Sequence, residues 1–334
     1  MECNDLVLKV ENLKTSFSVG KAHITAVNDV SIEAYAGRTL GVVGESGCGK
    51  SVMAHSIQQL LPPAGKIEKG QVFIHTGDGM VYDTTKLKPD CKKMRLLRGR
   101  EIGMIFQDPM SSLNPVYRIG DQIMEKLIEH KRIRRKDAKK LVIDLLGRLN
   151  IPEPEKRFDD YPHQFSGGMK QRVMIAIAIV NNPRLIIADE PTTALDVTIQ
   201  AQILELIKEI QTEFNSAIIL ITHNMGIIAE IADDIAVMYM GRIVERGTTR
   251  NVFNHPAHPY TQALLKSVPV LGIGGKKRLE PIRGTTPDPR FLPEGCPFSP
   301  RCDKAQSICT QSMPAETDLG DGHKASCHFC ERGV

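Results

Sequence analysis

The 334-residue sequence contains no tryptophan, few other aromatic residues and no long hydrophobic run. Its longest apolar run, residues 173–180, has eight residues, whereas a membrane-spanning helix needs about 18. The amino terminus has no basic stretch followed by an apolar one, so we expect no signal peptide. A net charge of only +4 does not require a nucleic-acid partner. We therefore expect a cytoplasmic protein that reaches a membrane only through other subunits.

The hydrophobic residues that are present follow an alternating order of strands and helices. We expect strands at 39–43, 185–188 and 217–221, β-segments at 6–32 (with a turn near Gly20), 66–82 and 234–247, and helices at 52–61, 119–130, 136–149, 169–180, 199–214 and 261–267. Strands that alternate with helices are typical of a parallel sheet with helices on both faces. The sequence therefore predicts an α/β core with a mixed, mainly parallel sheet, an antiparallel β subdomain and an inserted helical subdomain.

The composition changes near residue 255, where proline, glycine and cysteine become frequent and the periodicity fades. We expect a nucleotide-binding domain over residues 1–255, with the helical subdomain at about 109–182. Residues 256–334 are expected to form a small, irregular, cysteine-rich domain.

Residues 44–51 read GESGCGKS and match the phosphate-loop pattern G-x-x-x-x-G-K-[ST]. An apolar strand precedes them and a helix follows, which is the context that this loop needs to bind phosphate. Backbone N–H groups then point at the phosphates, and glycines allow the backbone to come close. Lys50 would neutralise the β- and γ-phosphates, and the Ser51 hydroxyl would bind Mg²⁺.

The strand at 185–188 ends in two adjacent carboxylates, Asp189 and Glu190. Beside a phosphate loop, an aspartate at such a strand end holds Mg²⁺, usually through water. A second carboxylate there can orient and deprotonate the attacking water. The alternative is a strand that simply leaves the sheet through a polar turn.

Three further stretches place polar residues at the ends of helices or strands. Ser166, Gly167 and Gly168 precede a helix and form a second anion site, unless Ser166 only caps that helix. One ATP molecule does not need two such loops from one chain, which indicates two subunits arranged head to tail. His223 follows an apolar strand, where a neutral imidazole could hold the γ-phosphate or the attacking water. Gln107 lies where the sheet gives way to the helical insert and could sense the γ-phosphate through Mg²⁺.

The order of these motifs resembles that of the ABC transporter ATPases over residues 6–250. The resemblance implies two ATPase subunits that enclose two ATP molecules, with Ser166 and Gly168 contacting the ATP held by the partner. It also implies that Glu190 is the general base, His223 the switch, and Gln107 the link to Mg²⁺ and the membrane subunits.

The resemblance assigns the remaining ATP contacts as well. It identifies Phe17 as the aromatic residue that stacks on adenine and Asp196 as part of an Ala-Leu-Asp loop. The predicted nucleotide-binding residues are Phe17, Gly44, Glu45, Ser46, Gly47, Cys48, Gly49, Lys50, Ser51, Gln107, Ser166, Gly167, Gly168 and Asp196, and the predicted Mg²⁺ ligands are Ser51, Gln107 and Asp189.

Several stretches resemble the peptide-importer branch of this family. The family's commonest motif is LSGGQ, whereas this chain reads FSGGM, followed by KQRVMIA. Because serine and the glycine backbone make the phosphate contacts, Met169 should not abolish them. Residues 104–115 (MIFQDPMSSLNP) and 258–265 (HPYTQALL) also resemble that branch.

Five of the eight cysteines lie between Cys296 and Cys330, with the spacing C-x₅-C-x₆-C-x₁₇-C-x₂-C. Structural disulfides are disfavoured in the cytoplasm, so a metal that orders a poor core is the better interpretation. Zinc sites usually carry paired C-x₂₋₄-C spacings, and only Cys327 and Cys330 have one. The spacing alone leaves zinc and an iron–sulfur cluster equally open.

Resemblance favours the cluster. Some peptide importers carry a tail of the form GC-x₅-C-x₆-C followed by HxxxC, whose four cysteines bind a 4Fe–4S cluster. The matching residues here are Cys296, Cys302, Cys309 and Cys327. His323 would be structural and Cys330 an additional thiol. Because the cluster would lie far in sequence from Lys50 and Glu190, we expect ATP hydrolysis to survive loss of the cluster better than assembly or transport does.

The sequence therefore predicts the ATP-hydrolysing motor of a dipeptide or oligopeptide importer that uses ATP, Mg²⁺ and a 4Fe–4S cluster. The resemblance implies a peripheral position at the cytoplasmic face of the membrane, on two transmembrane permease subunits. It also implies a second ABC ATPase, identical or homologous, an extracytoplasmic peptide-binding protein that acts indirectly, and no nucleic acid. The alternatives are nickel or oligosaccharide import by the same motor, and an iron–sulfur ABC ATPase without a transport role.

Overall fold

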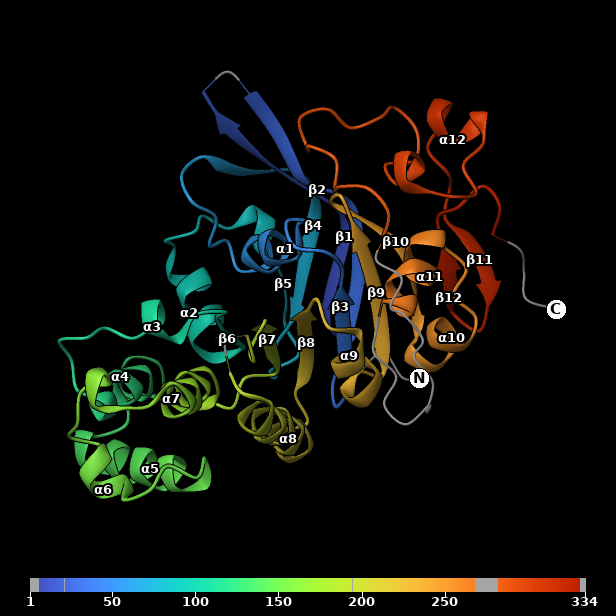
Figure 1. Cartoon of the computed structure of the whole chain (residues 1–334). Coiled ribbons are helices and arrows are strands. Elements are labelled where there is room, and N and C mark those ends of the chain that lie inside the picture. Colours follow the sequence, from blue (N-terminus) through green and yellow to red (C-terminus); the bar gives the residue numbers. More distant parts are fainter. Residues whose placement is uncertain (1–5, 21, 194, 268–281, 331–334) are drawn as a thin grey trace, which may run out of the picture. The chain divides into compact units, whose positions relative to one another are not determined.

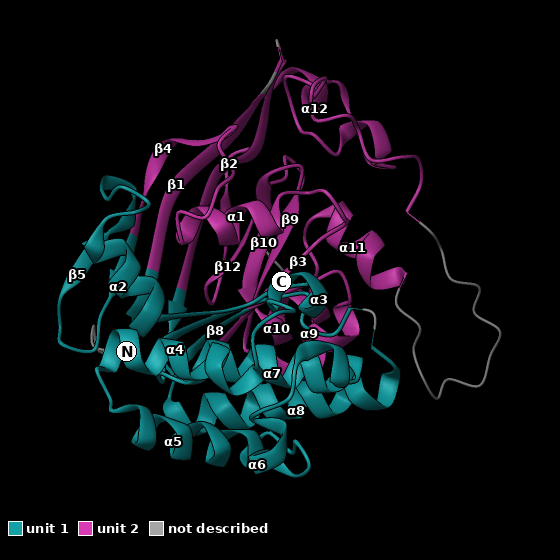
Figure 2. Cartoon of the chain, turned by 90° about the vertical axis from the view of Figure 1, so that its left-hand side faces the viewer, with its two compact units in different colours: residues 1–8, 34–38, 73–219 teal, residues 9–33, 39–72, 220–334 magenta. Residues whose placement is uncertain are grey.

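The computed structural model describes residues 6–20, 22–193, 195–267 and 282–330 (Figure 1). The chain forms two compact units, between which it passes several times (Figure 2). The first unit contains residues 1–8, 34–38 and 73–219, and the second contains residues 9–33, 39–72 and 220–334.

The sheet of the second unit is built around β3 (Thr39–Val43), in which all five residues are buried. It pairs in parallel with β9 (Asp234–Tyr239), and β9 pairs antiparallel with β10 (Arg242–Thr248). Two short strands of the tail, β12 (His323–Ala325) and β11 (Thr317–Gly320), extend this sheet beyond β10 in the order β11-β12-β10-β9-β3. The sheet is mixed, as predicted.

A second sheet, of which this unit holds the greater part, has the order β2-β1-β4, made by β1 (Leu6–Val19), β2 (Ala22–Tyr35) and β4 (Gly65–His75). We predicted short strands here, but β1 and β2 have 14 residues each. Both strands continue past a residue of positive φ, Asn12 and Asp29, and the two side chains hydrogen-bond to each other at 2.9 Å. The unit also contains α1 (Lys50–Ile57), α9 (Met225–Ile231), α10 (Thr249–Asn254), α11 (Pro259–Lys266), the 3₁₀ turn η3 (Ser299–Arg301) and α12 (Ser307–Gln311).

In the first unit, β6 (Ile102–Ile105) pairs in parallel with β7 (Leu185–Asp189), and β5 (Val81–Asp83) pairs antiparallel with the end of β4. The strand β8 (Ala217–Thr222) begins in this unit and ends in the other. The helical part, shown in teal in Figure 2, consists of α2 (Lys92–Arg100), α3 (Pro109–Ser112), α4 (Ile119–Lys131), α5 (Arg135–Arg148), α6 (Pro154–Arg157), α7 (Gly167–Ile179) and α8 (Val197–Phe214), with 3₁₀ turns η1 (Thr84–Lys86) and η2 (Pro162–Gln164).

The predicted elements differ from the observed ones mainly at their ends. The helix expected to reach residue 61 ends at Ile57, because Gln59 takes a φ of +55°, which a right-handed helix cannot continue. The strands β11 and β12 were not predicted, since elements of three or four residues are too short to show alternation. The boundary near residue 255 stays a prediction.

Candidate functional site

The phosphate loop connects β3 to α1 in the second unit, and close packing on both sides explains two of its glycines, Gly44 and Gly49. A Cβ on Gly44 would lie 2.1 Å from the backbone oxygen of Met238, and one on Gly49 would lie 2.2 Å from that of Ala26. Gly49 also has a φ of +107°, which residues with a Cβ rarely adopt. Any larger residue at either position would therefore push the loop off the core.

Lys50 is buried beneath this loop, with 5% of its surface exposed. Its Nζ donates to the backbone oxygens of Gly44 at 2.8 Å and Glu45 at 3.0 Å, so the ammonium holds the loop around itself. The neighbouring Cys48 is 1% exposed, and burial raises the pKa of its thiol. Its sulfur therefore stays protonated, and it lies 3.7 Å from Lys50 Nζ, which donates to it.

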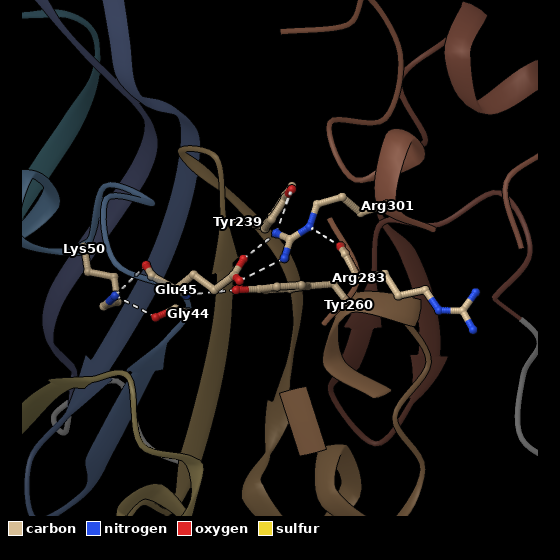
Figure 3. A network of polar contacts seen from close by, with 7 residues as sticks. All are labelled: Gly44, Glu45, Lys50, Tyr239, Tyr260, Arg283 and Arg301. Atoms are coloured by element: carbon tan, nitrogen blue, oxygen red, sulfur yellow. Dashed lines mark hydrogen bonds and ion pairs between the residues drawn. The ribbon is translucent and has the colours of Figure 1, made fainter. Parts of the chain in front are cut away.

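Glu45 makes contacts that the sequence did not suggest. Its backbone N–H donates to the Tyr260 hydroxyl at 2.9 Å, and its carboxylate accepts two hydrogen bonds from Arg301, at 2.6 and 3.0 Å (Figure 3). Arg301 belongs to the cysteine-rich tail, 256 residues away in the chain. Distance in sequence therefore does not correspond to distance in space, contrary to our assumption about the tail. The only local signal for Arg301 was its place directly before Cys302.

The other predicted residues of the second unit lie around this core. Ser51 is the second residue of α1, and His223 is exposed after β8, next to Asn224, which caps α9. The partly buried ring of Phe17 packs against Gly65, where a Cβ would approach its Cε1 atom to 2.8 Å. This contact fits a packing role for Phe17 as well as the predicted adenine contact.

In the first unit, strand pairing brings Gln107 and Glu190 together. The register of β6 and β7 places Ile105 opposite Ala188, so both polar residues lie two positions beyond a matched pair. The Gln107 Nε2 atom donates to Glu190 Oε2 at 3.0 Å, and the Thr193 hydroxyl donates to the same oxygen at 2.9 Å. Glu190 has a φ of +46°, so its backbone is strained. Strain at a charged residue on a strand end is typical of functional sites.

Asp189, at the end of β7, is 4% exposed. Its burial contrasts with the partial exposure of Glu190, so the two adjacent carboxylates occupy different environments.

The predicted second anion site lies at the start of α7. Ser166 caps this helix by accepting a hydrogen bond from the Met169 N–H at 3.3 Å, which confirms the capping role. Ser166 and Gly167 are nevertheless exposed, so this helix terminus faces outward. Asp196 caps α8 in the same way through the Ile199 N–H at 3.0 Å, and Ala194 of its loop lies outside the described residues. The predicted ATP-site residues thus form two groups, one in each compact unit.

Four cysteines of the tail line one cavity, and they are the four that we predicted as cluster ligands: Cys296, Cys302, Cys309 and Cys327. His258 and Phe298 are among the other residues that line it. Burial raises the pKa of the Cys296 thiol to about 11 and also raises the pKa values of Cys302 and Cys327. Cys330 is not among the residues that line this cavity, and its Sγ donates to the Cys327 backbone oxygen at 3.0 Å. Over the described ranges, no three His, Cys, Asp or Glu side chains meet in a geometry that would hold a metal ion.

Residues 27–193 match the family model described as ABC transporter, and residues 244–309 match the model described as oligopeptide/dipeptide transporter, C-terminal region. The chain belongs to the ABC transporter family. It is an ABC-type ATPase, which confirms the predicted enzyme class and the predicted ABC ATPase fold, while the small cysteine-rich domain stays a prediction. Membership of this family implies dimerisation and association with permease components.

Similar proteins cover almost the whole length of this ABC ATPase. The dipeptide transport ATP-binding protein DppD of Bacillus subtilis is 48% identical over 96% of this chain and 94% of its own length. The oligopeptide transport ATP-binding protein OppD of Salmonella typhimurium is 46% identical over 97% of this chain and 93% of its own. Among solved structures, the dimeric post-hydrolysis state of the cassette MJ0796 with ADP and Pi has a TM-score of 0.63 and 28% identity, over 73% of this chain and 99% of that one. Within the residues that the structure describes, no helix is long and apolar enough to cross a membrane.

Proposed function

We propose that this ABC ATPase drives the import of dipeptides or oligopeptides. The observation that carries the proposal is the match of residues 244–309 to the C-terminal region of oligopeptide/dipeptide transporters. That segment lies outside the part that matches ABC transporters in general. Relatives named for dipeptide and oligopeptide transport add support.

We infer that the protein works as a peripheral subunit at the cytoplasmic face of the membrane. It would bind two transmembrane permease subunits and a second ABC ATPase, identical or homologous, and would act indirectly with an extracytoplasmic peptide-binding protein. Exposed apolar side chains directly after Gln107 support a permease contact in this region. Met110, Val116 and Tyr117 are 64%, 73% and 58% exposed.

ATP would bind at the phosphate loop. There Lys50 would exchange its two backbone acceptors for phosphate oxygens, while the loop N–H groups bind the same anion. Ser51, Asp189 and Gln107 are the residues that would hold Mg²⁺, through oxygen atoms that suit this ion. When bound, Mg²⁺ supplies charge neutralisation on the β- and γ-phosphates.

Glu190 would act as the general base for the attacking water. Its carboxylate is oriented by Gln107 and Thr193, which both donate to Oε2. A fixed carboxylate loses little orientational freedom in the reaction, which favours proton transfer. His223 would act as the second catalytic residue by holding the γ-phosphate or the water.

The exposed start of α7 supports a head-to-tail pair of ATPases. Ser166, Gly167 and Gly168 would contact the ATP bound by the partner's phosphate loop, with Asp196 beside them at the start of α8. A Cβ on Gly168 would lie 3.1 Å from the Ile199 side chain, so the two helix starts are close together. In such a head-to-tail pair, the ligand of the second anion site would be the ATP bound by the partner.

The catalytic assignment is tested with Glu190→Gln, which keeps the shape of the side chain and removes its basicity. We expect unchanged MgATP binding and a loss of about 100-fold or more in the hydrolysis rate, as is usual when a general base is removed. Lys50→Ala should instead weaken binding itself. The exposed Glu129→Gln serves as the control, and normal hydrolysis by Glu190→Gln would exclude the general-base role.

The cargo is tested by uptake into cells that lack this chain, with and without a plasmid that restores it. We expect peptide uptake to depend on the chain. Normal peptide uptake together with lost nickel or oligosaccharide uptake would overturn the cargo and leave the ATPase assignment unaffected.

We also propose that Cys296, Cys302, Cys309 and Cys327 hold a 4Fe–4S cluster with a structural role. Two observations support the proposal: the four cysteines line one cavity, and the Cys296 N–H donates to the Cys309 backbone oxygen at 2.7 Å. Burial raises the pKa values of Cys296, Cys302 and Cys327 and so keeps these three thiols protonated when no metal is bound, whereas a bound metal stabilises the thiolate form. Bound iron–sulfur would order a segment that has little core of its own.

Protein purified without oxygen tests the cluster. It should be brown, absorb broadly near ~400 nm and contain equal amounts of iron and sulfide. Serine at any of the four positions should remove most of the colour, while Cys330→Ser, the matched control, should retain it. A colourless preparation with stoichiometric zinc would refute the cluster and favour the zinc alternative.

A further inference from the structure

Arg301 lies in the cysteine-rich tail, yet its side chain ends at the phosphate loop (Figure 3). We propose that Arg301 is a positioning residue for ATP binding, which makes the affinity of the loop for nucleotide depend on the folded tail. The inference rests on the proposed nucleotide site. It goes beyond that site because it assigns to the tail a role in shaping the loop.

The guanidinium of Arg301 is held from several directions. Nη1 and Nη2 donate to the two oxygens of Glu45 at 2.6 and 3.0 Å, and Nε donates to the Arg283 backbone oxygen at 2.9 Å. The group also lies 5.9 Å from the centre of the Tyr239 ring and 6.0 Å from that of Phe298. The side chain is only 4% exposed. These contacts fix the position of the Arg301 guanidinium. That position depends on the tail, because Arg283 and Phe298 belong to it.

Arg301 and Glu45 form a bidentate ion pair that is largely shielded from solvent. The Glu45 side chain is 25% exposed, so removing its partner would leave a carboxylate with limited access to water. We expect an unpaired Glu45 carboxylate to bind another cationic or N–H group or to move toward solvent, because an unpaired charge is costly in a buried position. A lysine at position 301 could not replace the pair fully, because an ammonium lacks the planar fork of donors.

Movement of Glu45 would be transmitted to the residue that binds phosphate. The Glu45 backbone oxygen accepts from Lys50 Nζ, and the Glu45 N–H donates to Tyr260. The next two residues, Ser46 and Gly47, are exposed, and a Cβ on Gly47 would meet nothing within 4 Å. Glu45 is therefore where the outer part of the loop is fastened to the rest of the unit. A displaced Glu45 would shift both the Lys50 ammonium and the N–H groups that face the phosphates.

A purely structural role would give a different result from a positioning role. If Arg301 only attached the tail, its loss would lower thermal stability and leave the nucleotide affinity of the folded protein unchanged. Arg283 offers a matched control in the same segment. Its side chain pairs with Asp303 at 3.0 Å, and both groups are largely exposed, at 81% and 70%.

The test measures MgADP affinity by calorimetry on the full-length chain, together with the melting temperature. We expect Arg301→Met to raise the Kd about tenfold or more, Arg301→Lys to raise it less, and Arg283→Gln to leave it unchanged. Glu45→Gln, which keeps the side-chain volume, should also weaken binding. Adding Arg301→Met to Glu45→Gln should then have little further effect, because the two residues act through one contact.

Lys50→Ala distinguishes the positioning role of Arg301 from the proposed nucleotide site itself. If Lys50→Ala weakens binding but folded Arg301→Met and Glu45→Gln bind normally, the positioning role is wrong and the nucleotide site remains. If Lys50→Ala also binds normally, the proposed nucleotide site is wrong, and this inference fails with it. Should Arg301→Met not fold, the Glu45→Gln and Arg301→Lys measurements decide the question.

Discussion

Glu245 of β10 is a fully buried carboxylate that hydrogen-bonds to the start of α11 and to β12. It accepts from the backbone N–H groups of Ala257 at 2.7 Å and His258 at 2.9 Å, and it bonds to His323 Nε2 at 2.8 Å. A buried charge is tolerated only when its oxygens are satisfied in this way. The contact supports the structural role predicted for His323, since this histidine fastens β12 to the core strand β10.

His258 gives this region a dependence on pH. It is buried, burial lowers its pKa to about 3, and its Nδ1 accepts from the Tyr260 N–H at 3.0 Å. Between pH 3 and about 6.5 the unfolded chain binds a proton here that the folded chain does not. Stability should therefore fall as pH is lowered through this range, by at most about 1.4 kcal/mol per pH unit.

We expect His258→Asn to flatten that dependence, because asparagine can accept the same helix-capping bond without titrating. Chemical denaturation at several pH values between 4 and 7 measures the effect, with the exposed His163→Asn as control. Parallel pH profiles for the wild type and His258→Asn would contradict the prediction.

At the scale of elements, α4 illustrates how the helical part is held together. Ile119, Ile123 and Leu127 recur every four residues and are buried, so one face of the helix packs inward. Lys126 lies beside this face. Its ammonium donates to the Ile177 backbone oxygen of α7 at 3.1 Å, and desolvation lowers its pKa to about 8. The helix therefore keeps a charge where an apolar group would be less costly.

We expect Lys126→Met to raise the free energy of unfolding by about 1–2 kcal/mol at pH 7, because it removes this desolvation cost and loses one hydrogen bond. Since the folded pKa is the lower one, the wild type should recover stability as pH rises from 8 toward 10.5. The advantage of the variant should shrink over that range in urea denaturation. The exposed Lys140→Met is the control, and an advantage that grows with pH would disprove the explanation.

At the scale of the whole molecule, the tail is part of the second unit's sheet. β12 pairs with β10 at Glu245 and Arg246, and the Arg246 guanidinium makes a double hydrogen bond to Glu316 at 2.8 and 2.7 Å. Through Arg301, which contacts Glu45, the cysteine-rich segment is connected to the phosphate loop as well as to the sheet. Loss of the tail should therefore affect ATP binding more than its distance in sequence suggested.

Ending the chain after Ser267 should lower the melting temperature by about 5–10 °C, because β10 becomes an unpaired sheet edge and Glu245 loses one partner. The same protein should aggregate more readily. Ending it after Cys330 is the control and should change neither property. A shortened protein that melts at the wild-type temperature would show that the tail contributes no stability to the core.

The sequence alone determined the parts of this protein whose chemistry is contiguous. The phosphate loop, the Asp189-Glu190 strand end and the SGG helix start were found because local backbone geometry and a few adjacent side chains define each of them. The four cysteines could be selected only by resemblance, because their spacing did not choose between zinc and iron–sulfur. Element centres followed from hydrophobic periodicity, which is a local property.

Only the tertiary structure decided which distant residues meet. Gln107 reaches Glu190 because β6 and β7 pair in one register, and Arg301 reaches Glu45 across 256 residues. The shared cavity of the four cysteines, and the exclusion of Cys330 from it, likewise arise from packing. No short window of sequence contains such contacts, because they depend on the free energy of the whole fold rather than on the preferences of neighbouring residues.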